Sequence, residues 1–221
     1  MIYKFSPSSL NLLKECPKCF WLHFNKNLKR PSGIFPSLPN GMDGVLKKHF
    51  DKYMEKSALP PEIKDLNIKL FEDKELLKIW RSNFKGIQFT DTDGNFLRGA
   101  VDNILVKDNK LIVMDYKTRG YPLKEDTAHH YQNQLDLYNY LLRKNGYQTE
   151  DYSYLLFYHP LHINEDGSFV FKTDLVKMNV SIANAENILK NALSILNNEM
   201  PDSDENCEYC KFAEKRKEES K

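Results

Sequence analysis

NFLRGAVDNILVKDNKLIVMDYKT, residues 95–118, is the stretch of sequence that decides the expected fold. It holds two short runs rich in apolar and β-branched residues, Asn95 to Val106 and Lys110 to Tyr116. The pair Asp108-Asn109 between them suits a tight turn. The stretch therefore predicts a β-hairpin whose second strand is buried.

Two aspartates lie among these apolar residues, Asp102 in the first run and Asp115 in the second. Burying a carboxylate without a partner is costly, so each predicts a metal ion, a base or a hydrogen-bond donor nearby. Lys117 follows Asp115 by two residues and, because strand side chains alternate, points to the same face. A metal held by the carboxylates can acidify a water, while the lysine orients it or offsets charge on a phosphorus. Alone, the Asp-x-Lys spacing is also typical of a surface ion pair.

Apolar residues at helical spacing flank the hairpin on both sides. Helices are expected in four segments: Ser6 to Leu22, interrupted by a cysteine pair, Gly44 to Tyr53, Asp126 to Lys144 and Ser181 to Asn197. A loop is expected from Pro31 to Asn40, and a second strand pair at Tyr152 to Tyr158 and Ser168 to Thr173. This order predicts a mixed α/β fold rather than a regularly alternating parallel one.

The chain of 221 residues is long enough for one good hydrophobic core. A single domain over 1–221 is expected, with a helical N-terminal elaboration at 1–60 and a cysteine-bearing C-terminal tail at 200–221. No segment approaches the roughly 18 uncharged apolar residues that span a bilayer, and the first residues do not have the pattern of an export signal. A cytoplasmic protein without a membrane partner is therefore expected.

The net charge is only +1, so any contact with DNA has to come from a local basic patch. Two segments are candidates, His23 to Pro31 (HFNKNLKRP) and the tail KFAEKRKEESK that begins at Lys211. Each is also typical of an ordinary solvated charged face.

The four cysteines form two Cys-x-x-Cys pairs near opposite ends of the chain, Cys16 with Cys19 and Cys207 with Cys210. Cytosolic thiols stay reduced, and an i, i+3 spacing turns both sulfurs towards one ion. The pairs therefore favour metal ligation over disulfides, with the N-terminal helical region tied to the C-terminus by a four-cysteine metal site.

An ordered set of motifs surrounds the two aspartates. It consists of Gly-x-x-Asp ending at Asp102, Asp-Tyr-Lys-Thr beginning at Asp115, and Gln-x-x-x-Tyr from Gln134 to Tyr138 on the next helix. With the N-terminal SPSSLNLLKECPKCFWL, these motifs make the chain resemble the PD-(D/E)XK nucleases of the RecB-like branch. The resemblance implies a restriction-endonuclease-like central sheet flanked by helices, and a deoxyribonuclease that depends on Mg²⁺ or Mn²⁺.

The resemblance also implies a metal-binding set. His49, on an early helix, and the two aspartates Asp102 and Asp115 are the implied side-chain ligands. The carbonyl of Tyr116 is implied as a backbone ligand.

Three further residues receive roles from the same resemblance. Lys117 is the implied catalytic lysine. Gln134 and Tyr138 lie one helical turn apart and so share a face, and are implied to support the site or to contact the DNA backbone.

Within this branch, the AddB-type recombination nucleases and the CRISPR-associated adaptation nucleases use one N-terminal and three C-terminal cysteines around a 4Fe-4S cluster. This chain has two of the three trailing cysteines, and Cys19 is the natural substitute for the third. The resemblance implies a 4Fe-4S cluster at Cys16, Cys19, Cys207 and Cys210, and two Cys-x-x-Cys pairs also make a good tetrahedral zinc site as the alternative.

The implied activity is exonucleolytic cleavage of single-stranded DNA or of DNA ends, in repair, recombination or CRISPR adaptation. Separate helicase or CRISPR adaptation proteins are the implied partners. A Holliday-junction, tRNA-directed or restriction-type enzyme is an alternative on the same fold. A catalytically retired DNA-binding scaffold is another, but it would be free to lose one of Asp102, Asp115 and Lys117, and all three are present.

Overall fold

A computed structural model describes residues 1–220; Lys221, the last residue of the expected cysteine-bearing tail, lies outside the described residues. The α-helices are α1 (Pro7–Glu15), α2 (Pro17–Asn25), α3 (Ser37–Met54), α4 (Lys74–Trp80), α5 (Gln132–Lys144), α6 (Ile182–Asn197) and α7 (Glu208–Glu219). The strands are β1 (Lys4–Phe5), β2 (Lys69–Leu70), β3 (Ile87–Thr90), β4 (Phe96–Gly99), β5 (Asn103–Lys107), β6 (Lys110–Thr118), β7 (Tyr152–Ile163) and β8 (Phe169–Asn179). Two short 3₁₀ helices are η1 (Pro61–Ile63) and η2 (Thr127–Tyr131).

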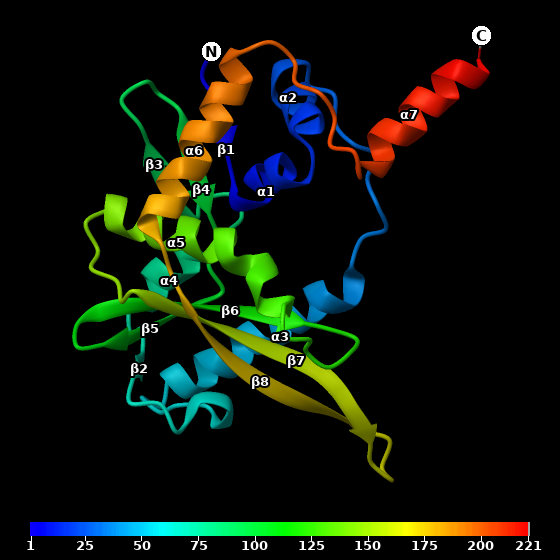
Figure 1. The fold of residues 1–221 in the computed structure, drawn as a ribbon. Helices are drawn as coiled ribbons and strands as arrows, with labels where there is room; N and C mark the ends of the chain where they lie inside the picture. Colours follow the sequence, from blue (N-terminus) through cyan, green and yellow to red (C-terminus); the bar gives the residue numbers. More distant parts are fainter. Residues whose placement is uncertain (221) are drawn as a thin grey trace.

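A five-stranded sheet in the order β2-β5-β6-β7-β8 forms the centre of the molecule (Figure 1). Only β6 and β7 run parallel; the other neighbours are antiparallel. Alternation along β6 sends Val113 towards the cluster of α5 and α6 side chains, and Ile112 and Met114 towards α3. The mixed α/β fold predicted from the sequence is confirmed.

The predicted hairpin forms, with the turn at the predicted place. Asp108 and Asn109 both adopt positive φ angles, of 47° and 61°, as a two-residue hairpin turn requires. The ladder between β5 and β6 begins with Asn103 opposite Met114. This register carries Asp102, just ahead of β5, alongside Asp115 on β6.

The first predicted strand, Asn95 to Val106, is wrong as a single element. It is split into β4 and β5, which belong to different sheets, because β4 pairs with β1 and β3 instead. Between them the backbone bonds to the end of α4: the Val101 amide donates to the Trp80 carbonyl, and Arg81 Nε donates to the Asp102 carbonyl at 2.7 Å. Asp102 therefore lies at a break before β5 rather than inside a strand.

The predicted helices form with shifted ends. Ser6 caps α1 with its side chain and Ser181 caps α6, as their sequences indicate. Cys16 ends α1 and immediately precedes α2, so the first cysteine pair does interrupt the N-terminal helix. α3 begins at Ser37, inside the predicted loop, because Pro39 falls in its first turn, where a missing N–H costs nothing.

Two elements extend beyond what the sequence indicated. The β7–β8 hairpin runs past the predicted ends at Tyr158 and Thr173 and projects from the body (Figure 1). Its outer part carries the exposed apolar side chains of Leu161, Ile163 and Phe169. The tail contains α7, which also stands away from the body. Within residues 1–220, no helix is both long enough and apolar enough to cross a membrane.

Candidate active site and cysteine cluster

Asp115 and Lys117 share one face of β6, as their spacing predicts. The Asp115 side chain is 2% exposed and forms an ion pair with the Lys117 ammonium. Burial raises the pKa of Asp115 to about 7, helped by the charge of Asp102 and opposed by Lys117. Burial acts against the charge of Lys117, but Asp115 raises its pKa, so the ammonium keeps its proton. The pair is a buried charge site that a cation would stabilise.

Gln134 connects this pair to α5. Its Oε1 accepts a hydrogen bond from Lys117 Nζ at 3.0 Å. Its Nε2 lies 3.3 Å from Asp115 Oδ1 and donates to the Tyr138 hydroxyl at 2.7 Å. The ring of Tyr131 lies 4.4 Å from Lys117 Nζ and covers the ammonium. One amide therefore fixes the carboxylate, the ammonium and the tyrosine of the predicted motifs together.

Gly99, the glycine of the Gly-x-x-Asp motif, has a packing role. A Cβ at this position would lie 2.8 Å from Tyr138 Cδ1 and 2.8 Å from Leu141 Cδ1. Any larger residue would therefore push α5, and with it Tyr138, away from the end of β4. The motif glycine allows the helix that carries Gln134 to pack closely against the strands.

Asp102 is held beside the same pair. Its Oδ2 accepts a hydrogen bond from the Tyr116 amide at 2.9 Å, so the carboxylate lies against the peptide that joins Asp115 to Tyr116. The Tyr116 ring points to the opposite face, where its hydroxyl accepts a hydrogen bond from Asn103 Nδ2. The Asp102 side chain is 18% exposed, so this corner of the site remains open to solvent.

His49, the proposed ligand on α3, contacts a carboxylate outside the predicted set. Its Nε2 lies 3.1 Å from Glu62 Oε1, and the Tyr158 hydroxyl donates to the same carboxylate at 3.0 Å. In the described part of the chain, the four cysteines are the only group of three or more metal-binding side chains whose ligand atoms all lie within 4.8 Å of one another. Neither His49 nor Asp43 forms such a group with Asp102 and Asp115 in the described residues.

Two residues that the sequence did not single out lie at Asp102 instead. Lys47 Nζ of α3 is 3.0 Å from Asp102 Oδ1 and 2.7 Å from Asp43 Oδ2. Burial raises the pKa of Asp43, while Lys47 lowers it and Asp102 adds to the rise. The only signal in the sequence was their i, i+4 spacing, which is typical of any surface ion pair on a helix.

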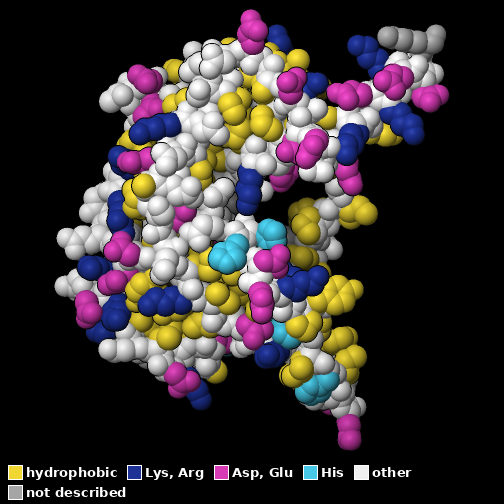
Figure 2. Space-filling model, in the orientation of Figure 1, with side chains coloured by type: hydrophobic (Ala, Val, Ile, Leu, Met, Phe, Trp, Pro, Cys, Tyr) yellow, Lys and Arg dark blue, Asp and Glu magenta, His cyan; other side chains and the backbone are white. Residues whose placement is uncertain are grey.

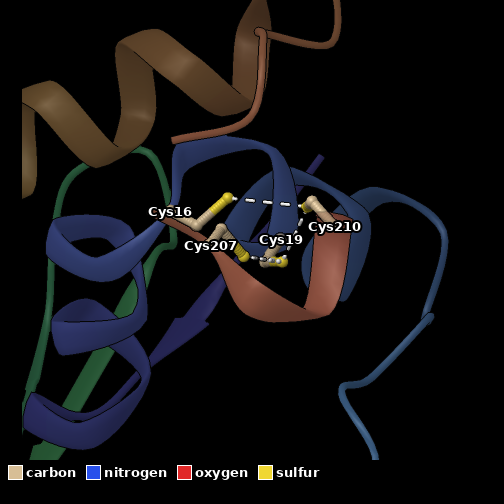
Figure 3. A group of neighbouring side chains, drawn as sticks. All are labelled: Cys16, Cys19, Cys207 and Cys210. Atoms are coloured by element: carbon tan, nitrogen blue, oxygen red, sulfur yellow. Dashed lines mark hydrogen bonds between the residues drawn. The ribbon is translucent and has the colours of Figure 1, made fainter. Parts of the chain in front are cut away.

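The cysteines meet as predicted (Figure 3). The Sγ atoms of Cys19 and Cys210 are 3.5 Å apart, those of Cys19 and Cys207 3.6 Å, and those of Cys16 and Cys210 3.9 Å. All four side chains are buried and none forms a disulfide. Burial opposes ionisation of Cys207, but hydrogen bonds from the Cys210 amide and the neighbouring thiols lower its pKa to about 7. Burial raises the pKa of Cys19 and Cys210, so these two thiols need a metal to replace the proton.

The sulfur spacing matches a single ion best. Zinc–sulfur bonds of about 2.3 Å in a tetrahedron place the sulfurs about 3.8 Å apart. Three of the six sulfur pairs lie 3.5–3.9 Å apart, and all four sulfurs lie within 4.8 Å of one another. A 4Fe-4S cluster binds each thiolate through a different iron and so holds the sulfurs farther apart. The donor set fits both metals chemically, and its spacing fits zinc.

Arg30 lies beside the cysteine cluster. Its Nη2 lies 3.4 Å from Cys207 Sγ, its guanidinium lies 4.6 Å from the ring centre of Tyr209, and it forms an ion pair with Glu15. A guanidinium offsets the negative charge that four thiolates carry around a divalent ion. The segment between α2 and α3 is thereby fastened to the cluster.

The two basic segments noted in the sequence line one groove next to this cluster. The groove has a volume of about 870 Å³. Leu22, Leu28 and Phe212 contribute apolar surface, and Lys29 and Lys217 contribute charge. Figure 2 shows basic and acidic side chains interspersed along the projecting α7. Segments from opposite ends of the sequence thus form one surface because the cysteines bring them together.

Two aspartates and a lysine lie together at a mixed sheet, next to a helix with the Gln-x-x-x-Tyr motif. This arrangement is typical of metal-dependent nucleases. A sequence model of the PD-(D/E)XK nuclease superfamily matches residues 47–214, and the chain belongs to that superfamily. The restriction-endonuclease-like fold implied by the motifs is thereby confirmed. No curated protein matches the chain.

Proposed function

We propose that the protein is a deoxyribonuclease dependent on Mg²⁺ or Mn²⁺ that acts as an exonuclease on single-stranded DNA or on DNA ends. One observation carries the proposal: Gln134 binds Lys117, Asp115 and Tyr138 at once, with Asp102 held against the Tyr116 amide. Such a network is costly to bury unless the charges have a use. Exonuclease action, and a role in repair, recombination or CRISPR adaptation with a separate helicase or adaptation proteins, come from the likeness to the RecB-like branch.

Each residue has a proposed role. Asp102 and Asp115 are side-chain ligands of the metal, with the Tyr116 carbonyl as a backbone ligand. A bound Mg²⁺ or Mn²⁺ supplies a Lewis acid for a phosphate oxygen and lowers the pKa of a water. Lys117, which stays charged beside Asp115, orients that water or offsets charge on the phosphorus. Gln134 and Tyr138 keep the lysine and carboxylate in register.

The groove beside the cysteine cluster supports DNA as the substrate. Its basic side chains suit phosphates, and Tyr209 and Phe212, 45% and 68% exposed, offer faces on which unpaired bases stack. This combination is typical of sequence-independent binding to a single strand.

The four cysteines are proposed to hold one structural zinc ion. The sulfur spacing supports zinc, and the 4Fe-4S cluster is the alternative from the resemblance. The absorbance spectrum and metal content of protein purified without oxygen decide between them, because an iron–sulfur cluster absorbs visible light and zinc thiolates do not.

The activity is tested on end-labelled single-stranded and duplex DNA with Mg²⁺ or Mn²⁺. The expected result is metal-dependent cleavage that Lys117→Met abolishes, while Lys110→Met, at the exposed start of β6, keeps the wild-type rate. Mononucleotide products released from a single end support exonuclease action. Binding of DNA without cleavage under any metal condition overturns the enzyme proposal and favours the retired scaffold.

A further inference from the structure

α3 offers two different faces to the rest of the molecule. Leu46 and Phe50 are buried against the sheet and fix the rotation of the helix. Asp43 and Lys47 lie on one flank of this buried stripe, and His49 lies on the other. Residues two apart in a helix are separated by roughly 200° around its axis. A helix that presents Lys47 to Asp102 therefore cannot present His49 to the same carboxylate.

The Lys47 ammonium lies within the site, between two carboxylates. Its side chain is only 21% exposed, and its ammonium lies between two carboxylate oxygens, 2.7 Å from Asp43 and 3.0 Å from Asp102. Asp102 is fixed from the other side by the Tyr116 amide. The ammonium thus contacts the carboxylate that is the open corner of the proposed metal site.

The net charge of the side chains around Asp102 balances a divalent ion once the Lys47 ammonium moves away. Asp43, Asp102 and Asp115 are three carboxylates, and Lys47 and Lys117 are two ammonium groups. When all three carboxylates are ionised and both lysines are in place, the group carries one excess negative charge. With Lys117 alone it carries two, which balances a divalent cation. Lys117 is also held by the Gln134 oxygen and covered by the Tyr131 ring. Lys47 pairs with Asp43 and Asp102, so it is the ammonium that can move away.

We propose that α3 contributes the carboxylate of Asp43 to the metal site, and not the imidazole of His49. Lys47 holds Asp43 and Asp102 together until the metal displaces its ammonium. This rests on the proposed function, since it requires a metal at Asp102. Lys47 thereby competes with the metal and keeps the carboxylates in place without one.

The proposal is tested by titrating Mn²⁺ into the full chain with its cysteine metal retained, in buffer free of other divalent ions and of chelators. Calorimetry and the electron paramagnetic resonance signal of free Mn²⁺ both report affinity without DNA. Asp115→Asn identifies the signal that belongs to this site. Circular dichroism confirms that each variant is folded.

Four variants have different expected results. Lys47→Met removes the competitor and tightens Mn²⁺ binding by about tenfold, the equivalent of one charge-assisted contact. Asp43→Asn weakens binding by about tenfold. His49→Gln leaves it unchanged, and Lys47→Arg, which keeps the charge, stays near wild type.

Weaker binding in Lys47→Met, or a loss in His49→Gln without one in Asp43→Asn, overturns the inference. Wild-type affinity in both Asp43→Asn and Lys47→Met overturns it as well, and leaves the proposed function intact if the protein binds Mn²⁺ and cleaves DNA. A wild-type protein that neither binds Mn²⁺ at the Asp115-dependent site nor cleaves DNA overturns both.

Discussion

The active site and the cysteine cluster are built in opposite ways. Asp102, Asp115, Lys117 and Gln134 come from one hairpin and the helix that follows it, whereas the cysteines come from the two ends of the chain. The first group consists of buried charges tied to one another by hydrogen bonds, and the second of thiols that meet only if the chain closes. The proposed active-site residues are therefore close in sequence, whereas the cysteine cluster joins the two ends of the chain. A change at one site should therefore leave the other site intact.

The largest effect is expected from Asp115→Asn. Because the change removes a proposed metal ligand and the charge partner of Lys117, DNA cleavage should fall at least about 10³-fold, roughly 4 kcal/mol of transition-state stabilisation. The metal content of the cysteine cluster should stay at one equivalent, measured by elemental analysis of the same sample. Loss of the cluster metal along with activity would show that the two sites are not independent.

Cys16→Ala should have the reverse pattern. Removing one thiolate opens the cysteine cluster between α1 and α7, with an expected loss of about 3 kcal/mol of stability, or about 10 °C in melting temperature. Cleavage of a short oligonucleotide per folded molecule should change only a few-fold below the transition. Lys14→Gln, exposed in the last turn of α1, is the matched control. An unchanged melting temperature of the metal-replete variant would contradict a structural role of the cysteine cluster.

Gln134→Leu tests whether the amide network matters beyond the charges. It leaves Lys117 and Asp115 in place but without their common hydrogen-bond partner. Supporting residues of this kind are worth about 10–100-fold in activity, so kcat should fall by that factor while the melting temperature moves little. Lys144→Gln, exposed at the end of the same helix, serves as the control. A wild-type kcat in Gln134→Leu would show that the hydrogen bonds of Gln134 do not contribute to catalysis.

The smallest effect is expected in the groove. The double change Lys29→Gln with Lys217→Gln removes two exposed charges that line it. Affinity for a single strand should fall by about threefold, and the slope of log affinity against log salt should drop by about 1. Lys69→Gln, an exposed lysine of β2, controls for net charge. An unchanged salt slope would exclude phosphate contacts at these lysines.

Several features were open to prediction from sequence because local forces decide them. The turn at Asp108-Asn109 follows from residues that tolerate positive φ. The shared face of Asp115 and Lys117 follows from strand alternation. The hydrogen bond between Gln134 and Tyr138 follows from helical spacing. The single-domain division at 1–60 and 200–221, and the roles given to the individual site residues, stay predictions.

Other features depended on partners distant in sequence. The break between β4 and β5 arises because α4 takes the hydrogen bonds of Val101 and Asp102 away from the ladder. The sequence predicts a helix from Gly44 to Tyr53 that carries His49, but the burial of Leu46 and Phe50 sets the rotation of α3 that brings Lys47 to Asp102. A periodic pattern identifies a face to about one residue in each direction, and a ligand position needs finer resolution than that.

The hairpin, the Asp-x-Lys pair and the two cysteine pairs could be predicted from the sequence, because backbone geometry and residue spacing are local properties. Only the tertiary structure decided which α3 residue meets Asp102, how Gly99 lets α5 approach the site, and that two basic segments from opposite ends form one groove. These outcomes depend on packing between elements, and packing is fixed by the whole chain closing on its core and its cysteines rather than by any one segment.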